Sequence, residues 1–240
     1  MADLTDNSQI ARLTSNGAKP VLAILGGTGK EGPGLALRWA YAGYPIIIGS
    51  RQVEKAEYTA RELQATLAGY VDKAPAIRGM ENSAAARQAD ICVLTVVQAA
   101  HQDALVSLKD DLQGKILVDA TARVDFRDPH PPAPPAAALI AQQILGPGVR
   151  VVAAFQNVPA HALRKNLGQE MDTDVLVCAE DQDAAREVIA LAQAVGMRAY
   201  FAGGLENAVI VEGITALLIS INKYYGIKTA SIAVTGLNAA

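Results

Sequence analysis

The residues with the clearest capacity for chemistry lie in a glycine-dense turn near the N-terminus. An apolar run of strand length, 21–25, enters a turn in which Gly27, Gly29 and Gly32 fit the spacing G-x-G-x-x-G, and a helical pattern follows over 35–42. Glycines let the main chain approach a pyrophosphate, and the first N–H groups of the helix favour its negative charge. The turn therefore predicts a dinucleotide site, although a purely structural glycine turn has a similar pattern. Its candidate residues are Gly27, Thr28, Gly29, Lys30, Glu31 and Gly32.

The end of the second predicted strand indicates which dinucleotide binds. An acidic residue there would hydrogen-bond the adenosine ribose and repel a 2′-phosphate, but this chain has Ser50 and Arg51, with Lys55 one helical turn further on. A guanidinium binds phosphate through paired hydrogen bonds, and an ammonium adds positive charge. Alternatively, both cations belong to a solvated helix start beside Glu54, where cations are unfavourable. The three residues favour NADP over NAD.

Further candidate contacts follow the central strands, because their carboxyl ends face the ligand crevice in a doubly wound sheet. Four residues at the end of the fourth strand offer polar groups and apolar surface to a nicotinamide and its ribose, and Ala120 and Ala122 follow the fifth strand. Asp119 either joins them or caps its own loop. The amides of Gln156 and Asn157, after the sixth strand, can hydrogen-bond a second substrate. The four residues at the end of the fourth strand are Thr95, Val96, Val97 and Gln98.

No residue is identified as catalytic with certainty. His161 is the one histidine that the pattern places near the cleft, and a lone histidine is more often structural. The chain has no G-x-S-x-G elbow, Walker lysine or metal-ligand cluster, and Tyr58, Tyr70 and Tyr200 have no lysine four residues later, as a short-chain dehydrogenase would require. Hydride transfer without a metal or a dedicated protein acid fits what remains.

Composition narrows the class of protein. The chain has 240 residues, of which 51% are hydrophobic and 19% charged, and its net charge of −3 argues against a nucleic-acid partner. Residues 1–17 lack the order of a signal peptide, and the longest apolar stretch, within 210–221, is interrupted and too short for a bilayer. Cys92 and Cys178 lie in apolar runs typical of buried thiols. We expect a cytoplasmic protein without a membrane partner.

Alternating strand and helix patterns predict an α/β fold, a Rossmann-type doubly wound parallel sheet with a small C-terminal α+β domain. We expect a flexible extension over 1–17, an NADP-binding domain over 18–155, and a C-terminal domain over 156–240 that completes the substrate cleft. Its apolar last helix would support a homodimer or a higher homo-oligomer. The proline-rich segment 128–135 either borders the cleft or binds a partner domain. The expected strands are 21–25, 45–49, 76–79, 90–96, 115–119, 151–155, 174–179 and 198–202, and the expected helices are 35–42, 53–67, 100–112, 136–145, 183–195 and 208–225.

From about residue 20 to its C-terminus, the chain resembles the F420-dependent NADP oxidoreductases, also called NADPH-dependent F420 reductases. The resemblance includes the glycine turn and the Gly49-Ser50-Arg51 sequence with Lys55. It continues through Val93-Leu94-Thr95 and the residues around Gln156 and Asn157. The matching segments are 25–32, 49–55, 93–95, 151–160, 202–207 and 235–237.

The resemblance implies reversible hydride transfer between C4 of NADP(H) and C5 of the deazaflavin coenzyme F420, with the two rings held face to face. It adds Ala160 to the NADP contacts. The chain differs from some relatives at Gln156, where they have histidine, and near Val209, where others have arginine. Other readings are an NADPH-dependent reductase of a flavin, ferric chelate or imine, and a non-catalytic NADP-binding redox sensor. The implied F420 contacts are Gln156, Asn157, Val158, Pro159, Leu205 and Asn207, and the ring is positioned by Gln156, Asn157 and Pro159.

Overall fold

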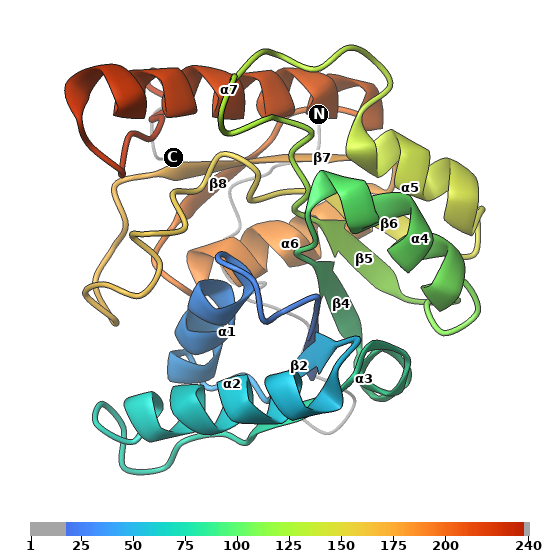
Figure 1. The fold of residues 1–240 in the computed structure, drawn as a ribbon, viewed down its shortest axis with the longest axis vertical. Coiled ribbons are helices and arrows are strands. Elements are labelled where there is room, and N and C mark those ends of the chain that lie inside the picture. The colour runs from blue at the N-terminus through green and yellow to red at the C-terminus, as the bar shows by residue number, and fades with distance from the viewer. Residues whose placement is uncertain (1–17, 238–240) are drawn as a thin grey trace.

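Short apolar strands alternate with helices along the chain, and the computed structural model, which describes residues 18–237, assembles them into one eight-stranded sheet covered on both faces (Figure 1). The expected extension 1–17 lies outside the described residues. The strands are β1 (Leu22–Leu25), β2 (Ile46–Ser50), β3 (Ile77–Glu81), β4 (Ile91–Leu94), β5 (Ile116–Asp119), β6 (Arg150–Ala153), β7 (Asp174–Ala179) and β8 (Arg198–Phe201). The helices are α1 (Gly32–Tyr41), α2 (Val53–Leu67), α3 (Asn82–Gln88), α4 (Gln98–Leu108), α5 (Ala137–Leu145), α6 (Gln182–Gln193) and α7 (Ala208–Tyr225), with a 3₁₀ turn, η1 (Leu205–Asn207).

The strand order is β3-β2-β1-β4-β5-β6-β7-β8. The first six strands are parallel, in the order typical of a Rossmann fold, which confirms the predicted fold class. β7 then pairs antiparallel with β6 through Val152 and Ala179, and β8 pairs parallel with β7. The C-terminal segment therefore extends the same sheet. The domain boundary after residue 155 stays a prediction.

The predicted elements agree with the structure to within a few residues, with two informative differences. α1 begins at Gly32 rather than at residue 35, because Pro33 in the first turn already has a helical φ and needs no N–H acceptor. α3 is absent from the prediction. Its seven residues, rich in alanine, have no apolar period, and the Glu81 side chain caps it by accepting a hydrogen bond from Ser83 N at 2.8 Å.

The core lies in two layers, one on each face of the sheet. α1, α2 and α6 contribute to one cluster, and α3, α4, α5 and η1 contribute to the other. Trp39 of α1 is fully buried in the first layer, where its ring meets Phe155 edge-on at 5.5 Å between centroids. Its Nε1 also donates to the carbonyl of Leu191 on α6 at 2.9 Å. The first layer thus joins residues from both sides of position 155.

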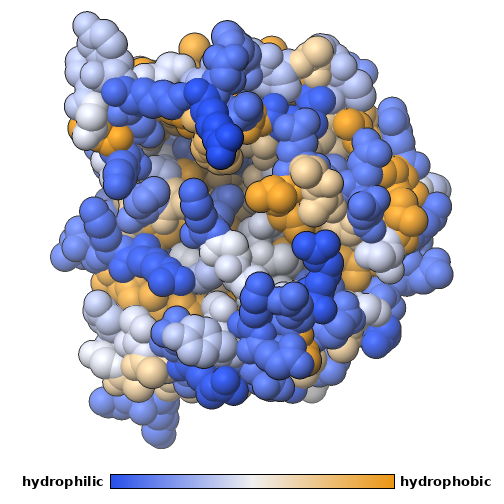
Figure 2. All heavy atoms as spheres, in the orientation of Figure 1, coloured by the Kyte–Doolittle hydropathy of each residue, from blue (hydrophilic) through white to orange (hydrophobic). Residues whose placement is uncertain are grey.

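α7 is the longest apolar element of the described chain. Its expected inability to span a bilayer is wrong as to length: the segment Leu205–Tyr225 is 21 residues long, with a mean hydropathy of 1.4, enough to cross a membrane by length and composition alone. Of its most apolar 18-residue window, 44% is buried in the protein, and Glu212, in the middle of α7, is fully buried in an ion pair with Arg123. One side of α7 therefore packs on the protein, whereas Ile210 and Leu217 are exposed. Hydrophilic side chains cover most of the face drawn in Figure 2.

Segment 122–136 has no helix or strand and lies against α7 (Figure 1). Lys223 Nζ donates to the carbonyl of Arg127 at 2.7 Å, and a Cβ on Gly213 would lie 3.5 Å from Pro131. The proline-rich part is an ordered surface segment held by the last helix. Whether it borders the cleft or binds a partner stays a prediction.

Candidate functional site

The glycine turn between β1 and α1 is held by close main-chain contacts. Gly26 has a φ of +69°, and its N–H donates to Asn82 Oδ1 at 3.1 Å. A Cβ on Gly32 would lie 2.8 Å from both Gly27 Cα and Thr95 Oγ1, so any side chain would push the start of α1 away from the turn and from β4. The spacing of these glycines therefore has a packing reason in this structure.

The turn that leads into α1 presents main-chain hydrogen-bond donors that the described residues do not use. The N–H groups of Thr28 and Lys30 have no acceptor there, and Pro33 has no N–H to satisfy. Unpaired donors at a helix N-terminus, together with the positive end of the helix dipole, bind phosphate groups. The turn can therefore hold a pyrophosphate, as its sequence predicts.

Glu31 is the unexpected member of this turn. One of its carboxyl oxygens, Oε1, is buried without a hydrogen-bond partner, and burial raises the pKa of Glu31 to about 8. At neutral pH the group is therefore mainly protonated. A neutral carboxyl donates a hydrogen bond to an anion, whereas a carboxylate would repel it.

The end of β2 carries free cations. Ser50 is nearly buried, and its Oγ accepts from Gln52 N at 3.1 Å. Arg51 and Lys55 are exposed and form no ion pair with any described residue. Two unpaired cations beside the start of a helix suit a bound phosphate, as predicted.

β4 and β5 end side by side, because Leu94 pairs with Asp119. Val97 is 70% exposed just beyond β4, an apolar surface available to a ring. Asp119 is fully buried, and its two oxygens accept from Thr121 N at 3.0 Å and meet His101 Nε2 at 2.7 Å. Asp119 and His101 therefore have structural partners, which favours the capping reading of Asp119. The remaining candidates here range from half-buried to buried; they are Thr95, Val96, Ala120 and Ala122, whereas Gln98 is exposed.

The end of β6 carries strained backbone next to amide side chains. Phe155 has a φ of +75°, a region that costs a residue with a side chain about 1 kcal/mol or more. Gln156 Nε2 then donates to the carbonyl of Asp119 at 2.9 Å, and Asn157 Nδ2 donates to the carbonyl of Asp174 at 2.7 Å. These bonds hold both amides with the oxygen as the free end. Gln156 Oε1 and Asn157 Oδ1 are buried without a partner, so each can accept a hydrogen bond from a ligand N–H.

The other predicted contacts with the second substrate are less uniform. Pro159 and Ala160 are half-buried, whereas Val158 is nearly buried and His161 is exposed. The Leu205 side chain is fully buried in the core. In η1, Asn207 Nδ2 donates to the carbonyl of Ala202 at 2.8 Å. The assignment of ligand contacts to these residues stays a prediction.

Three residues with contacts at the site have no signal in the sequence. Asn82 supports the glycine turn from α3, and the buried Thr121 leaves Oγ1 unpartnered beside Asp119. Thr215 of α7 donates from Oγ1 to the carbonyl of Gln156 at 2.8 Å, which ties the last helix to the end of β6. Asn82 and Thr215 each contact a residue more than fifty positions away in the chain. The surroundings of Thr121 Oγ1 are known only from the fold. Position in a motif could not identify them.

A second network joins α7 to the segment after β5. Glu212 Oε2 accepts from Arg123 Nε at 3.0 Å and from its N–H at 3.0 Å, while Oε1 accepts from Ala137 N at 2.7 Å. Burial raises the pKa of Glu212, against the opposing effect of these donors. The last helix therefore holds the wall of the cleft beyond β5.

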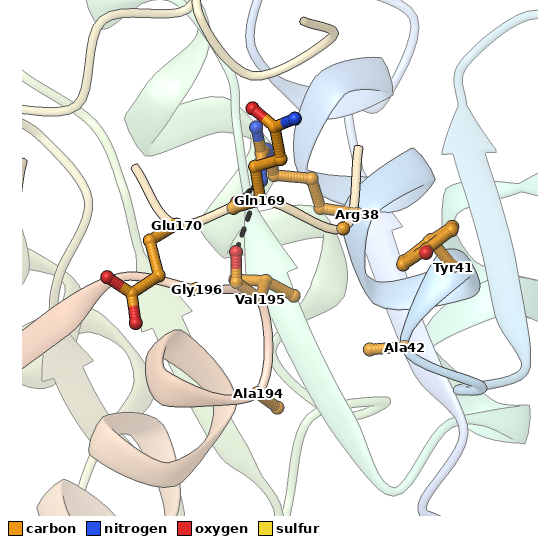
Figure 3. Close-up of a pocket in the computed structure, with 9 residues that line it drawn as sticks. Arg38, Tyr41, Ala42, Gln169, Glu170, Ala194, Val195 and Gly196 are labelled. Atoms are coloured by element: carbon orange, nitrogen blue, oxygen red, sulfur yellow. Dashed lines mark hydrogen bonds between the residues drawn. The ribbon is translucent and has the colours of Figure 1, made fainter. Parts of the chain in front are cut away.

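A pocket of about 170 Å³ lies at the other end of α1, between Tyr41, Gly168 and Val195 (Figure 3). Arg38 enters it and is buried, donating to the carbonyls of Leu163 at 2.8 Å and Val195 at 3.2 Å. Since α1 rises about 1.5 Å per residue, this pocket lies some 14 Å from the glycine turn. Arg38 thus anchors the segment after β6. Because of the distance along α1, this pocket is separate from the dinucleotide site.

Comparisons with known proteins show the family of this chain. Residues 21–123 match the family model described as NADP oxidoreductase coenzyme F420-dependent. The F420-dependent NADP reductase of Methanothermobacter thermautotrophicus is 40% identical over 90% of this chain and 95% of its own length, and that of Methanocaldococcus jannaschii is 41% identical over 90% and 98%. A solved Arthrobacter structure, provisionally described as an F420-dependent NADP reductase, is 25% identical with a TM-score of 0.71, over 90% of this chain and 100% of its own.

The protonated state of Glu31 predicts a pH-dependent stability. An unfolded glutamate loses its proton near pH 4.5, whereas the folded one keeps it to about pH 8. The folded state binds more protons across this window, so its unfolding free energy falls as pH rises, by up to about 1.4 kcal/mol per pH unit. Glu31→Gln should lack this contribution. Urea denaturation between pH 5 and 9 measures it.

The exposed Glu54→Gln on α2 is the matched control and should keep the wild-type dependence on pH. If the wild type and Glu31→Gln show parallel profiles, the Glu31 carboxyl is ionised in the folded protein and this assignment is wrong.

Proposed function

Because this chain belongs to the F420-dependent NADP reductases, we propose that it catalyses reversible hydride transfer between NADP(H) and coenzyme F420 by holding the two rings face to face. Family membership rests on about 40% identity across nine-tenths of the chain. The reaction moves a hydride from C4 of NADPH to C5 of the deazaflavin, and a proton from solvent completes the reduced coenzyme. No metal or covalent intermediate is needed.

The observation that carries the proposal is the pairing of the glycine turn with unpaired cations at the end of β2. β1 and β2 are neighbours, and Gly27 N donates to the carbonyl of Gly49 at 2.9 Å, which brings the turn beside Ser50 and Arg51. The turn suits a pyrophosphate, and the cations suit a phosphate nearby. A dinucleotide with a 2′-phosphate has both groups.

We propose that the site also holds a second flat ligand. Gln156 Oε1, Asn157 Oδ1 and Thr121 Oγ1 are buried and unpartnered, and each buried polar atom without a partner costs about 1–3 kcal/mol. N–H groups of a carboxamide or of a deazaflavin ring can satisfy such acceptors. We propose that these atoms orient the rings while Val97 and the other apolar residues exclude water.

We further propose that the NADP-binding segment 18–155 and segment 156–240 act as separate functional units on one sheet. The first holds the dinucleotide, and the second supplies Gln156, Asn157 and the α7 contact through Thr215. The protein is proposed to act in the cytoplasm, without nucleic-acid or membrane partners.

The function is tested by mixing the purified protein with NADPH and F420 and following the deazaflavin absorbance. We expect loss of this absorbance at a rate that depends on both substrates. Binding of NADPH with no turnover of F420 would contradict the proposal. A panel of a flavin, a ferric chelate and a cyclic imine then separates a different reductase from a non-catalytic sensor.

The 2′-phosphate assignment predicts the effect of Arg51→Ala. Loss of a charge-assisted hydrogen bond, worth about 1.5–3 kcal/mol, should raise the KM for NADPH roughly ten- to a hundredfold and leave the KM for NADH unchanged. Initial rates with both cofactors measure this. Arg61→Ala on α2, the helix that follows Arg51, is the control, because Arg61 Nη1 lies 3.9 Å from Glu57 Oε2, and it should affect neither. Equal changes for NADPH and NADH would refute the assignment.

We propose that α7 forms the interface of a homodimer. Ile210, Leu217, Ile221 and Tyr224 are 66%, 58%, 41% and 83% exposed, and their spacing places them on one side of the helix. Leu217→Glu should convert a dimer to a monomer, since it buries a charge without a partner in the interface. Light scattering after size exclusion measures the mass. A monomeric wild type, or a variant that remains dimeric, would contradict this interface.

A further inference from the structure

A polar cavity next to the dinucleotide site has no role in the function derived so far. It has a volume of about 290 Å³ and lies between the start of α4, the segment after β5, and Ile140 of α5. Complete ligand sites have volumes of about 300–1,000 Å³, so a cavity of this size suits one part of a larger ligand. Most of its lining is polar: Gln98, His101, Gln102, Asp103 and Arg123 surround it, together with Ala99.

Arg123 gives the cavity a fixed cation. Its Nε donates to Glu212 Oε2 at 3.0 Å, and its Nη2 donates to the carbonyl of Ala133 at 2.9 Å. Nη1 has no acceptor among the described residues. The guanidinium is therefore held in place from two sides, and one donor nitrogen is left for a ligand. Because the side chain is already fixed, it loses little conformational entropy when an acceptor binds.

Two of the remaining polar groups of the cavity can donate hydrogen bonds and have no partner among the described residues. The amides of Gln98 and Gln102 form no hydrogen bond with the described residues, and both side chains are exposed. His101 is occupied by Asp119, and the Glu212 carboxylate lies behind Arg123. Asp103 is the one carboxylate of the lining itself. A guanidinium nitrogen and two free amides are donors suited to phosphate or carboxylate oxygens.

The cavity adjoins the predicted ring site directly. Gln98 belongs to both, and Arg123 follows Ala122, a predicted nicotinamide contact, in the chain. We infer that this cavity binds an anionic group of the second substrate, the phosphodiester or a carboxylate on the side chain of the deazaflavin. This inference rests on the proposed function, since the ring of the same ligand must occupy the neighbouring site.

The test compares F420 with the deazaflavin that has only its ribityl chain and lacks the phosphodiester and carboxylates. Arg123→Gln should raise the KM for F420 about tenfold or more, and the KM for the shortened deazaflavin should stay near its wild-type value. Because Arg123→Gln also leaves Glu212 without its cation, circular dichroism must show that the variant is folded. Two substitutions of opposite charge at the exposed Gln102 provide a second test, which leaves the contact between Arg123 and Glu212 intact.

Gln102→Glu should raise, and Gln102→Lys should lower, the KM for F420 by about two- to fivefold, as expected for one partly screened charge. Neither should change the KM for the shortened deazaflavin or for NADPH. Gln193→Glu, an exposed position on α6 across the sheet, is the matched control and should change none of the three constants.

If the variants change the KM for both deazaflavins in parallel, the inference is overturned. It is also overturned if only the KM for NADPH changes, because the anionic group would then belong to the dinucleotide. Failure of the proposed function is distinguishable, because the wild type would then reduce neither deazaflavin. If the wild type reduces both deazaflavins with the same KM, the side chain makes no contact and the cavity assignment fails while the function stands.

Discussion

The close contact between the start of α1, the glycine turn and the end of β4 is the constraint on which the rest of the site depends. Gly32 can lie against Gly27 and Thr95 only because it has no side chain. The turn that leads into α1 leaves the N–H groups of Thr28 and Lys30 without an acceptor among the described residues. Such free donors, together with the positive end of the helix dipole, bind phosphate groups.

The C-terminal part of the chain completes the site at the same edge of the sheet. β7 and β8 extend the Rossmann sheet, and α7 then returns to the site, where Thr215 holds the carbonyl of Gln156. Glu212 holds Arg123 and the start of α5. A helix that is apolar enough for a membrane is thus fixed in the protein by two polar contacts from its buried side. Those contacts shape the wall of the cleft.

The net charge at the site depends on the burial of its ionisable groups as well as on their residue types. Arg51 and Lys55 stay exposed and unpaired at the end of β2. Glu31, in the phosphate turn itself, would oppose an anion if ionised, but burial raises its pKa to about 8 and keeps it mainly neutral at physiological pH. The turn therefore accommodates a carboxyl group without repelling a phosphate.

The sequence by itself determined the fold class, most elements and the family, because apolar periods and glycine spacing are local properties of the chain. The bounds of α2, β7 and α7 agree with their predicted ranges. Only the tertiary structure decided that the C-terminal strands continue the first sheet, that Asn82 supports the turn, and that the amide oxygens of Gln156 and Asn157 are buried without a partner. These outcomes depend on contacts between residues far apart in the chain. No local sequence pattern encodes which carbonyl accepts a hydrogen bond from an amide side chain, or which carboxyl group is buried away from water.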